Sequence, residues 1–168
     1  MKMRKSAVSA GRPGATVNTM HTQIRTTRTR EIAEVSLREM IARLNVIDAT
    51  IDTVATGSDM DRTVAANDLL NQFDVLAFTA SRLRVSDVQR VTDALEAVVL
   101  SAQARRGRRD VELGATLRHG VDVLMLLTHD ATRRLQGHPA ADLGGATAAL
   151  FDRVERVLNG HASVNPAA

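Results

Sequence analysis

VTDALEAVVLSAQARRGRRDVELGATLRHGVDVLMLL, residues 91–127, contains two amphipathic helical patterns joined by a short basic segment. In both halves apolar residues recur three or four positions apart, the spacing of one helix face. These residues are Val91, Leu95, Val98 and Val99 in the first half, and Leu113, Leu117, Val121, Leu124 and Leu127 in the second. The segment between them, RRGRR at 105–109, contains a helix-ending Gly. So short a connection predicts two neighbouring antiparallel helices.

The same helical spacing continues on both sides of this pair, and no segment alternates as a strand would. Caps and glycines predict five helices: from Thr29 to about Ala55, from the SDMD at 58–61 to about Leu83, from Ser86 to Gly107, from Asp110 to Gly137, and from Asp142 to Gly160. Short connections favour an all-α, up-and-down antiparallel four-helix bundle with the fifth helix appended.

Each predicted helix has one apolar stripe, which we expect to form the core. The stripe of the first helix is Ile32, Leu37, Met40, Ile41, Leu44, Ile47, Ile51 and Val54, and that of the second is Val64, Leu69, Leu70, Phe73, Leu76, Ala80 and Leu83. The third stripe begins at Val88, the fourth reaches Leu135, and the fifth comprises Leu150, Val154 and Leu158.

Composition agrees with packed helices. The 168 residues suit one domain with extensions, and their hydrophobic fraction of 44% is ordinary for a globular protein. Only 2% of the residues are aromatic, with three Phe and no Trp or Tyr, which points away from sandwiches and barrels. The absence of Cys excludes a disulfide framework, a thiolate metal site and a Cys nucleophile. With no apolar run near the roughly 20 residues of a membrane span and no signal-peptide core, we expect a cytoplasmic protein.

Charge is distributed unevenly along the chain. Residues 1–30 contain seven basic residues and no acidic one: Lys2, Arg4, Lys5, Arg12, Arg25, Arg28 and Arg30. The rest of the chain contains 15 basic and 19 acidic residues. We therefore predict a disordered basic tail at 1–28, the bundle at 29–160 and a second tail at 161–168. Translation starting at Met20 would remove much of the first tail.

The usual signatures of an active site are missing from the sequence. None of the five His belongs to a Glu-x-x-His pair. His119 and His129 are ten residues apart on one helix, so their side chains point in different directions and cannot share a metal. We expect both in solvent. No Ser lies in a nucleophile elbow, and LGG at 143–145 lacks the Lys-Ser/Thr end of a phosphate loop. The sequence predicts no enzyme, cofactor or metal.

The RRGRR segment is the densest basic cluster. Arg105 and Arg106 lie at the predicted C-terminus of a helix, where cations interact favourably with the helix dipole. They therefore need no further role. Arg108 and Arg109 follow the turn and lack that explanation. With the basic tail, the four arginines are candidate contacts to nucleic acid or to an acidic partner.

The second predicted helix has an unusual outward side. In NQFDVLAFTASRLRV, residues 71–85, Phe73, Leu76, Ala77, Ala80 and Leu83 form the inner stripe. The outward positions are Asp74, Phe78, Arg82 and Arg84. An aromatic on a polar side is typical of a binding patch. The alternative is that the fifth helix or the N-terminal tail covers Phe78.

Residues 34–135 resemble the histidine phosphotransfer (HPt) domain of chemotaxis-type kinases. Leu95-Glu96 matches a Leu-Glu pair of its third helix, the Arg-Gly turn follows, and Leu117, Asp122 and Leu124 match the pattern of its fourth helix. The resemblance implies a bacterial protein of two-component signalling that binds a receiver domain or a histidine kinase.

The same resemblance shows where the phosphotransfer residues are replaced. Aligned without a gap from Leu95, Asp74 stands at the phosphoaccepting His, Ala77 at the Lys, Phe78 at the Gly and Arg84 at the turn Gly. A second register puts Asn67 at the His. Neither supplies the imidazole nucleophile or the cation beside it. The resemblance thus implies a non-catalytic adaptor that docks through Asp74, Phe78, Arg82 and Arg84.

Two further interpretations remain open at the level of sequence. The chain can be a nucleic-acid-associated helical protein that acts through the tail and RRGRR, with steeply salt-dependent binding. It can also be a structural bundle whose stripes partly face another copy.

Overall fold

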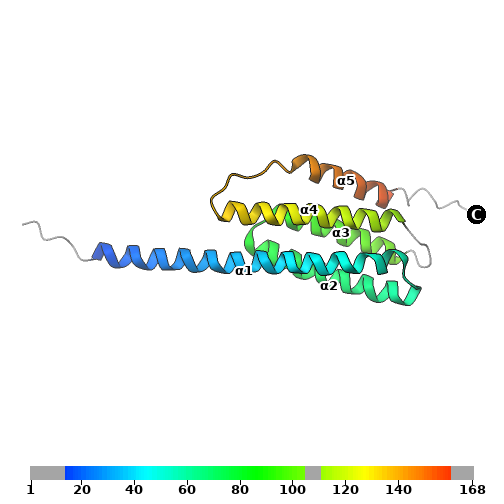
Figure 1. The fold of residues 1–168 in the computed structure, drawn as a ribbon, viewed down its shortest axis with the longest axis horizontal. Helices are drawn as coiled ribbons and strands as arrows, with labels where there is room; N and C mark the ends of the chain where they lie inside the picture. The colour runs from blue at the N-terminus through cyan, green and yellow to red at the C-terminus, as the bar shows by residue number, and fades with distance from the viewer. Residues whose placement is uncertain (1–13, 105–110, 160–168) are drawn as a thin grey trace, which may run out of the picture.

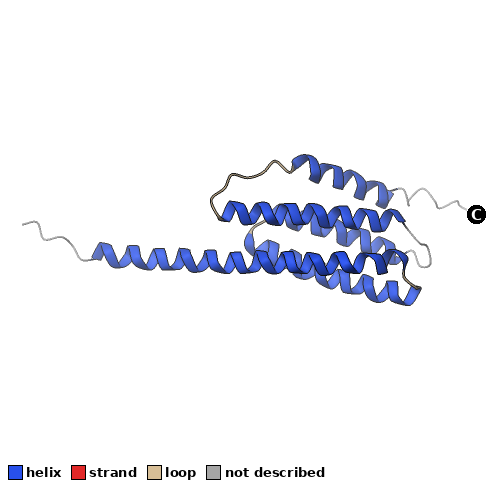
Figure 2. Ribbon diagram, in the orientation of Figure 1, coloured by secondary structure: helices blue, strands red, loops and turns tan. Residues whose placement is uncertain are grey.

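A computed structural model describes the backbone of residues 14–104 and 111–159, and the side chains of 27–104 and 112–159. The described residues form five helices and no strand, which confirms the predicted all-α class (Figure 2). The helices are α1 (Gly14–Thr56), α2 (Asp59–Leu83), α3 (Ser86–Ala104), α4 (Val111–Leu135) and α5 (Gly144–Asn159). Residues 1–13 of the predicted N-terminal tail (1–28), and the predicted C-terminal tail at 161–168, lie outside the described residues.

The first four helices pack as an antiparallel ring, in which α1 contacts α2 and α4, and α3 contacts α2 and α4 (Figure 1). Helix α5 lies on one side, against α3 and α4. This arrangement is the predicted four-helix bundle with an appended fifth helix. No helix among the described residues covers the side of α2 that faces away from the bundle.

The core is filled by the predicted stripes. Its fully buried side chains include Leu44, Ile47, Ile51, Leu69, Phe73, Leu76, Leu95, Leu117 and Leu124. Phe73 is the largest of the fully buried side chains and lies at the middle of α2. All five predicted residues of α3, from Val88 to Val99, are buried as well.

Two predicted core residues point to solvent instead. Ile32 is 56% exposed and Val64 is 55% exposed. Ile32 is one residue away from the position that continues the α1 stripe, so its side chain is rotated outward. Beside Val64, the buried Ala65 and Ala66 occupy the inner positions of α2. The sequence pattern favoured the larger Val64 for the core, whereas the structure buries the smaller Ala65 and Ala66 there.

Helix α1 begins earlier than the predicted boundary at Thr29. The helix begins at Gly14 and continues without interruption to Thr56. No Pro or Gly occurs between Gly14 and Gly57, so the sequence contains no strong helix breaker there. The apolar periodicity located the start of the bundle contacts, because it reports burial and not helicity.

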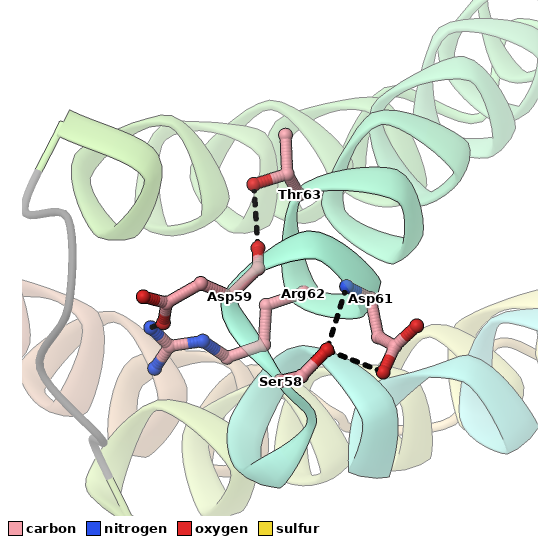
Figure 3. A network of polar contacts seen from close by, with 5 residues as sticks. All are labelled: Ser58, Asp59, Asp61, Arg62 and Thr63. Atoms are coloured by element: carbon pink, nitrogen blue, oxygen red, sulfur yellow. Dashed lines mark hydrogen bonds and ion pairs between the residues drawn. The ribbon is translucent and has the colours of Figure 1, made fainter.

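Local side-chain chemistry sets the ends of α2. Ser58 is the N-cap, as the SDMD segment predicted, and its hydroxyl oxygen accepts the Asp61 N–H at 3.3 Å (Figure 3). The same hydroxyl donates to the Asp61 carboxylate at 2.5 Å, and Arg62 pairs with Asp59 at 2.6 Å. At the other end Arg84 adopts the left-handed conformation with φ 57°. These two caps fix the length of α2 and its connection to α3.

The connection between α4 and α5 is held by a buried carboxylate. Asp130 is buried, accepts the Ala141 N–H at 2.7 Å and pairs with Arg134 at 2.9 Å. A buried charge is tolerated where it is paired and hydrogen-bonded in this way. Asp130 therefore ties the segment before α5 to α4.

Gly120 of α4 lies close against Leu95 of α3. A Cβ built on Gly120 would lie 2.4 Å from a methyl carbon of Leu95, whose side chain is fully buried. Gly145 of α5, by contrast, has no atom within 4 Å of such a Cβ. The two glycines form a matched pair for testing how tightly the bundle is packed.

We predict that Gly120→Ala lowers the free energy of unfolding by about 1–3 kcal/mol, because the added methyl overpacks the α3–α4 contact. Gly145→Ala should change it by less than about 1 kcal/mol, in the stabilising direction, because Ala has the higher helix propensity. Urea unfolding followed by circular dichroism measures both. Equal effects of the two substitutions would contradict the packing of α3 on α4.

Candidate docking surface on α2

The side of α2 opposite its core stripe carries exposed apolar residues. We call Met60, Val64, Val75, Phe78 and Arg82 the α2 outer face; all five are exposed. Phe78 is 64% exposed and Val75, three residues earlier, is 43% exposed. Residues three and four apart on a helix are neighbours, so Val75, Phe78 and Arg82 form one continuous surface. Sequence reasoning placed Phe78 and Arg82 there, and the structure agrees.

Arg82 partly covers the ring of Phe78. Its guanidinium carbon lies 5.8 Å from the ring centroid, which is within cation–π distance. Such a contact at an exposed site contributes roughly 0.5–1 kcal/mol. It holds the ring and the charge together, so a partner that covers Phe78 also meets the guanidinium.

Three carboxylates border this surface on the side of α3. Asp74 and Asp93 are exposed, while Glu96 of α3 is half-buried. Burial raises the pKa of Glu96, and repulsion from Asp74 and then from Asp93 raises it further. We call Asp74, Asp93 and Glu96 the acidic edge. The candidate surface thus has an apolar centre, a cation at one end and anions along one side.

Arg84, the fourth predicted docking residue, has a structural role. Its backbone N–H is donated to the carbonyl oxygens of Ala80 and Ser81, and the Val85 N–H is donated to Ala80 at 3.0 Å. This left-handed position after a helix is usually occupied by Gly. The Arg84 side chain is exposed beyond the end of α2.

Helix α5 does not cover Phe78. It contacts α3 and α4, and within the described residues it makes no contact with α2. One alternative from the sequence, that Phe78 packs under the fifth helix, is therefore wrong. The other covering segment, the N-terminal tail, lies outside the described residues for 1–13.

The remaining candidate residues are placed only in part. Arg105, Arg106, Arg108 and Arg109 lie outside the described residues. Asn67, the second candidate for the histidine position, accepts a hydrogen bond from Gln103 of α3 at 2.8 Å. Of the two α4 histidines expected in solvent, His129 is exposed and His119 is half-buried. The described part of the chain brings no three His, Asp or Glu side chains together as a metal site would need.

Sequence reasoning missed Val75, Met60 and Glu96. Val75 lies three residues before Phe78, so helical spacing from the outward Phe could have found it. Met60 and Val64 continue the same side toward the start of α2, but Val64 was assigned to the core. Glu96 could be connected to Asp74 only once the antiparallel register of α2 and α3 was known.

The chain matches no protein-family model, no curated protein and no solved structure. None of its described helices has both the length and the apolar character for crossing a membrane.

We predict that Glu96→Gln raises the stability of the protein at pH 7 and that this gain shrinks as the pH falls. With its pKa raised by folding, Glu96 binds a proton more readily in the folded state than in the unfolded state. Its contribution therefore becomes more favourable as the pH falls through the raised pKa toward the usual value. The effect should be small and should weaken in salt, because the neighbouring Asp74 and Asp93 are exposed to solvent.

Urea unfolding of parent and variant between pH 7 and pH 4, at low and high salt, measures this difference. Glu155→Gln on α5 is the control, since Glu155 lies outside the acidic edge. A parent and a Glu96→Gln variant with identical pH profiles would show that the acidic edge does not interact as described.

Proposed function

We propose that the protein is a non-catalytic, HPt-like adaptor that binds a receiver domain or a histidine kinase of two-component signalling through the α2 outer face. The observation that carries this proposal is the exposure of Phe78 beside Val75 and Arg82. Aromatic residues and Arg are enriched in the centres of protein interfaces, where the charge is otherwise low. Between Asn71 and Ser81 the only charged residue is Asp74.

The fold supports the comparison with an HPt domain without identifying one. An antiparallel four-helix bundle is the architecture that the resemblance implies, and Asp74 is exposed on α2 at the position aligned with the phosphoaccepting His. Arg84 has the left-handed backbone that suits the aligned turn Gly, although many helix ends share this feature.

The side chains at the aligned positions support binding without phosphotransfer. A carboxylate at Asp74 replaces the imidazole nucleophile, and the half-buried Ala77 brings no cation to the phosphoryl oxygens. Phe78 adds a large apolar group where the family has none. The surface is therefore suited to holding a partner and not to transferring a phosphoryl group.

We predict that Phe78→Ala weakens binding to a cognate receiver domain or kinase by roughly 1–3 kcal/mol, the range for loss of an interface anchor. Arg82→Glu should weaken it too, by removing the cation over the ring. Leu126→Ala, which truncates an exposed residue of α4, is the control and should leave affinity unchanged. Calorimetric titration measures all three.

Incubation of the purified protein with a cognate kinase and ATP should give no phosphohistidine. Phosphohistidine formed on the chain would contradict the non-catalytic assignment. Partner binding that Phe78→Ala leaves intact would move the interface away from the α2 outer face. If no receiver domain or kinase of the source organism binds, the partner class is wrong.

A further inference from the structure

Helix α1 is much longer than the bundle that it belongs to. Its 43 residues span about 65 Å, whereas the 25 residues of α2 span about 38 Å. The N-terminal part of α1 projects past the other helices (Figure 1). Among the α1 residues whose side chains are described, from 27 on, Leu37 is the first that is buried. An isolated helix is only marginally stable in water. Packing against a partner would therefore stabilise this projecting segment.

The outward side of α1 carries a second stripe of helical spacing. The core stripe contains Leu37, Met40, Leu44, Ile47, Ile51 and Val54. On the opposite side, six exposed residues follow one another at alternating intervals of three and four: Ile32, Val35, Glu39, Ala42, Val46 and Ala49. Intervals of three and four are those of the seam between paired helices. We call these six residues the α1 outer face.

The two halves of α1 have opposite net charges, which favours a second copy of this chain as the partner on the α1 outer face. Residues 14–30 contain Arg25, Arg28 and Arg30 and no acidic residue, a net charge of +3. Residues 31–56 contain five acidic residues and two Arg, a net charge of −3. Two copies of α1 placed antiparallel bring the basic half of each against the acidic half of the other. A parallel pair would put like charges together.

One register pairs the two apolar residues nearest the centre of the contact and also pairs opposite charges. Placing Ile32 against Val35 of a second copy also places Arg28 against Glu39 of that copy. Residues 14–30 of each chain then lie along residues 37–53 of the other. The projecting segment of one copy then runs along the part of α1 that packs within the bundle of the second copy. A two-fold axis relates the two halves of this contact.

We propose that the α1 outer face is the interface of an antiparallel homodimer, in which each projecting N-terminal helix packs along α1 of the second copy. This interface uses no residue of the α2 outer face and does not depend on the function proposed for it.

Sedimentation equilibrium of the full-length chain tests the dimer. The parent should have twice the monomer mass of 18.1 kDa, and the pair Ile32→Glu with Val35→Glu should raise the dimer dissociation constant at least roughly tenfold. Arg28→Glu and Glu39→Arg should each weaken the dimer, and the two together should restore it. Leu126→Glu on α4 is the control and should leave the mass unchanged. Circular dichroism checks that each variant keeps the helical bundle.

A single engineered cysteine reports the orientation, because the chain has no Cys of its own. Spin labels on Thr53→Cys should lie about 60 Å apart in the antiparallel dimer and about 10 Å apart in a parallel one. A monomeric parent, a dimer that the α1 variants leave intact, or the short distance would each overturn the proposal.

Discussion

Burial of the apolar stripe of α2 is the constraint on which the other features of the molecule depend. Phe73 occupies the middle of the core and is fully enclosed. Because Phe78 follows five residues later, it is turned about 140° away around the helix axis. Fixing Phe73 inward therefore fixes Phe78 outward. The same rotation places Asp74 beside α3 and leaves Val75 and Arg82 next to the exposed ring.

The neighbouring helices hold this rotation in place. Ser58 and Arg84 fix the two ends of α2, while Gln72 accepts a hydrogen bond from Arg43 of α1, and Asn67 accepts one from Gln103 of α3. Helix α5 lies on α3 and α4, on another side of the bundle. Helix α2 is thus capped at both ends and hydrogen-bonded to α1 and α3, and no described helix covers its outer face, which favours a preorganised binding surface.

Most of the fold was predictable because stripes and caps are local. The α3 stripe, the Ser58 cap and the order of five helices all follow from residue spacing. The start of α1 was not, because the basic charge and the Ser, Thr and Gly content of residues 1–28 favoured disorder. Val64 was misplaced because a local pattern cannot measure how closely helices approach, and Ala65 and Ala66 fill the space instead. The acidic edge was missed because the neighbours of Glu96 come from a different helix.

Helix α2 thus places Phe73 in the core on one side and exposes Phe78 on the opposite side. Urea unfolding of Phe73→Ala and Phe78→Ala tests this arrangement most directly, since both changes remove the same side chain from the same helix. Phe73→Ala should lower the free energy of unfolding by about 3–5 kcal/mol, as expected for a buried Phe. Phe78→Ala should change it by no more than about 0.5 kcal/mol, as expected for a surface position. A loss of about 3 kcal/mol or more for Phe78→Ala would contradict the account, because Phe78 would then be part of the core.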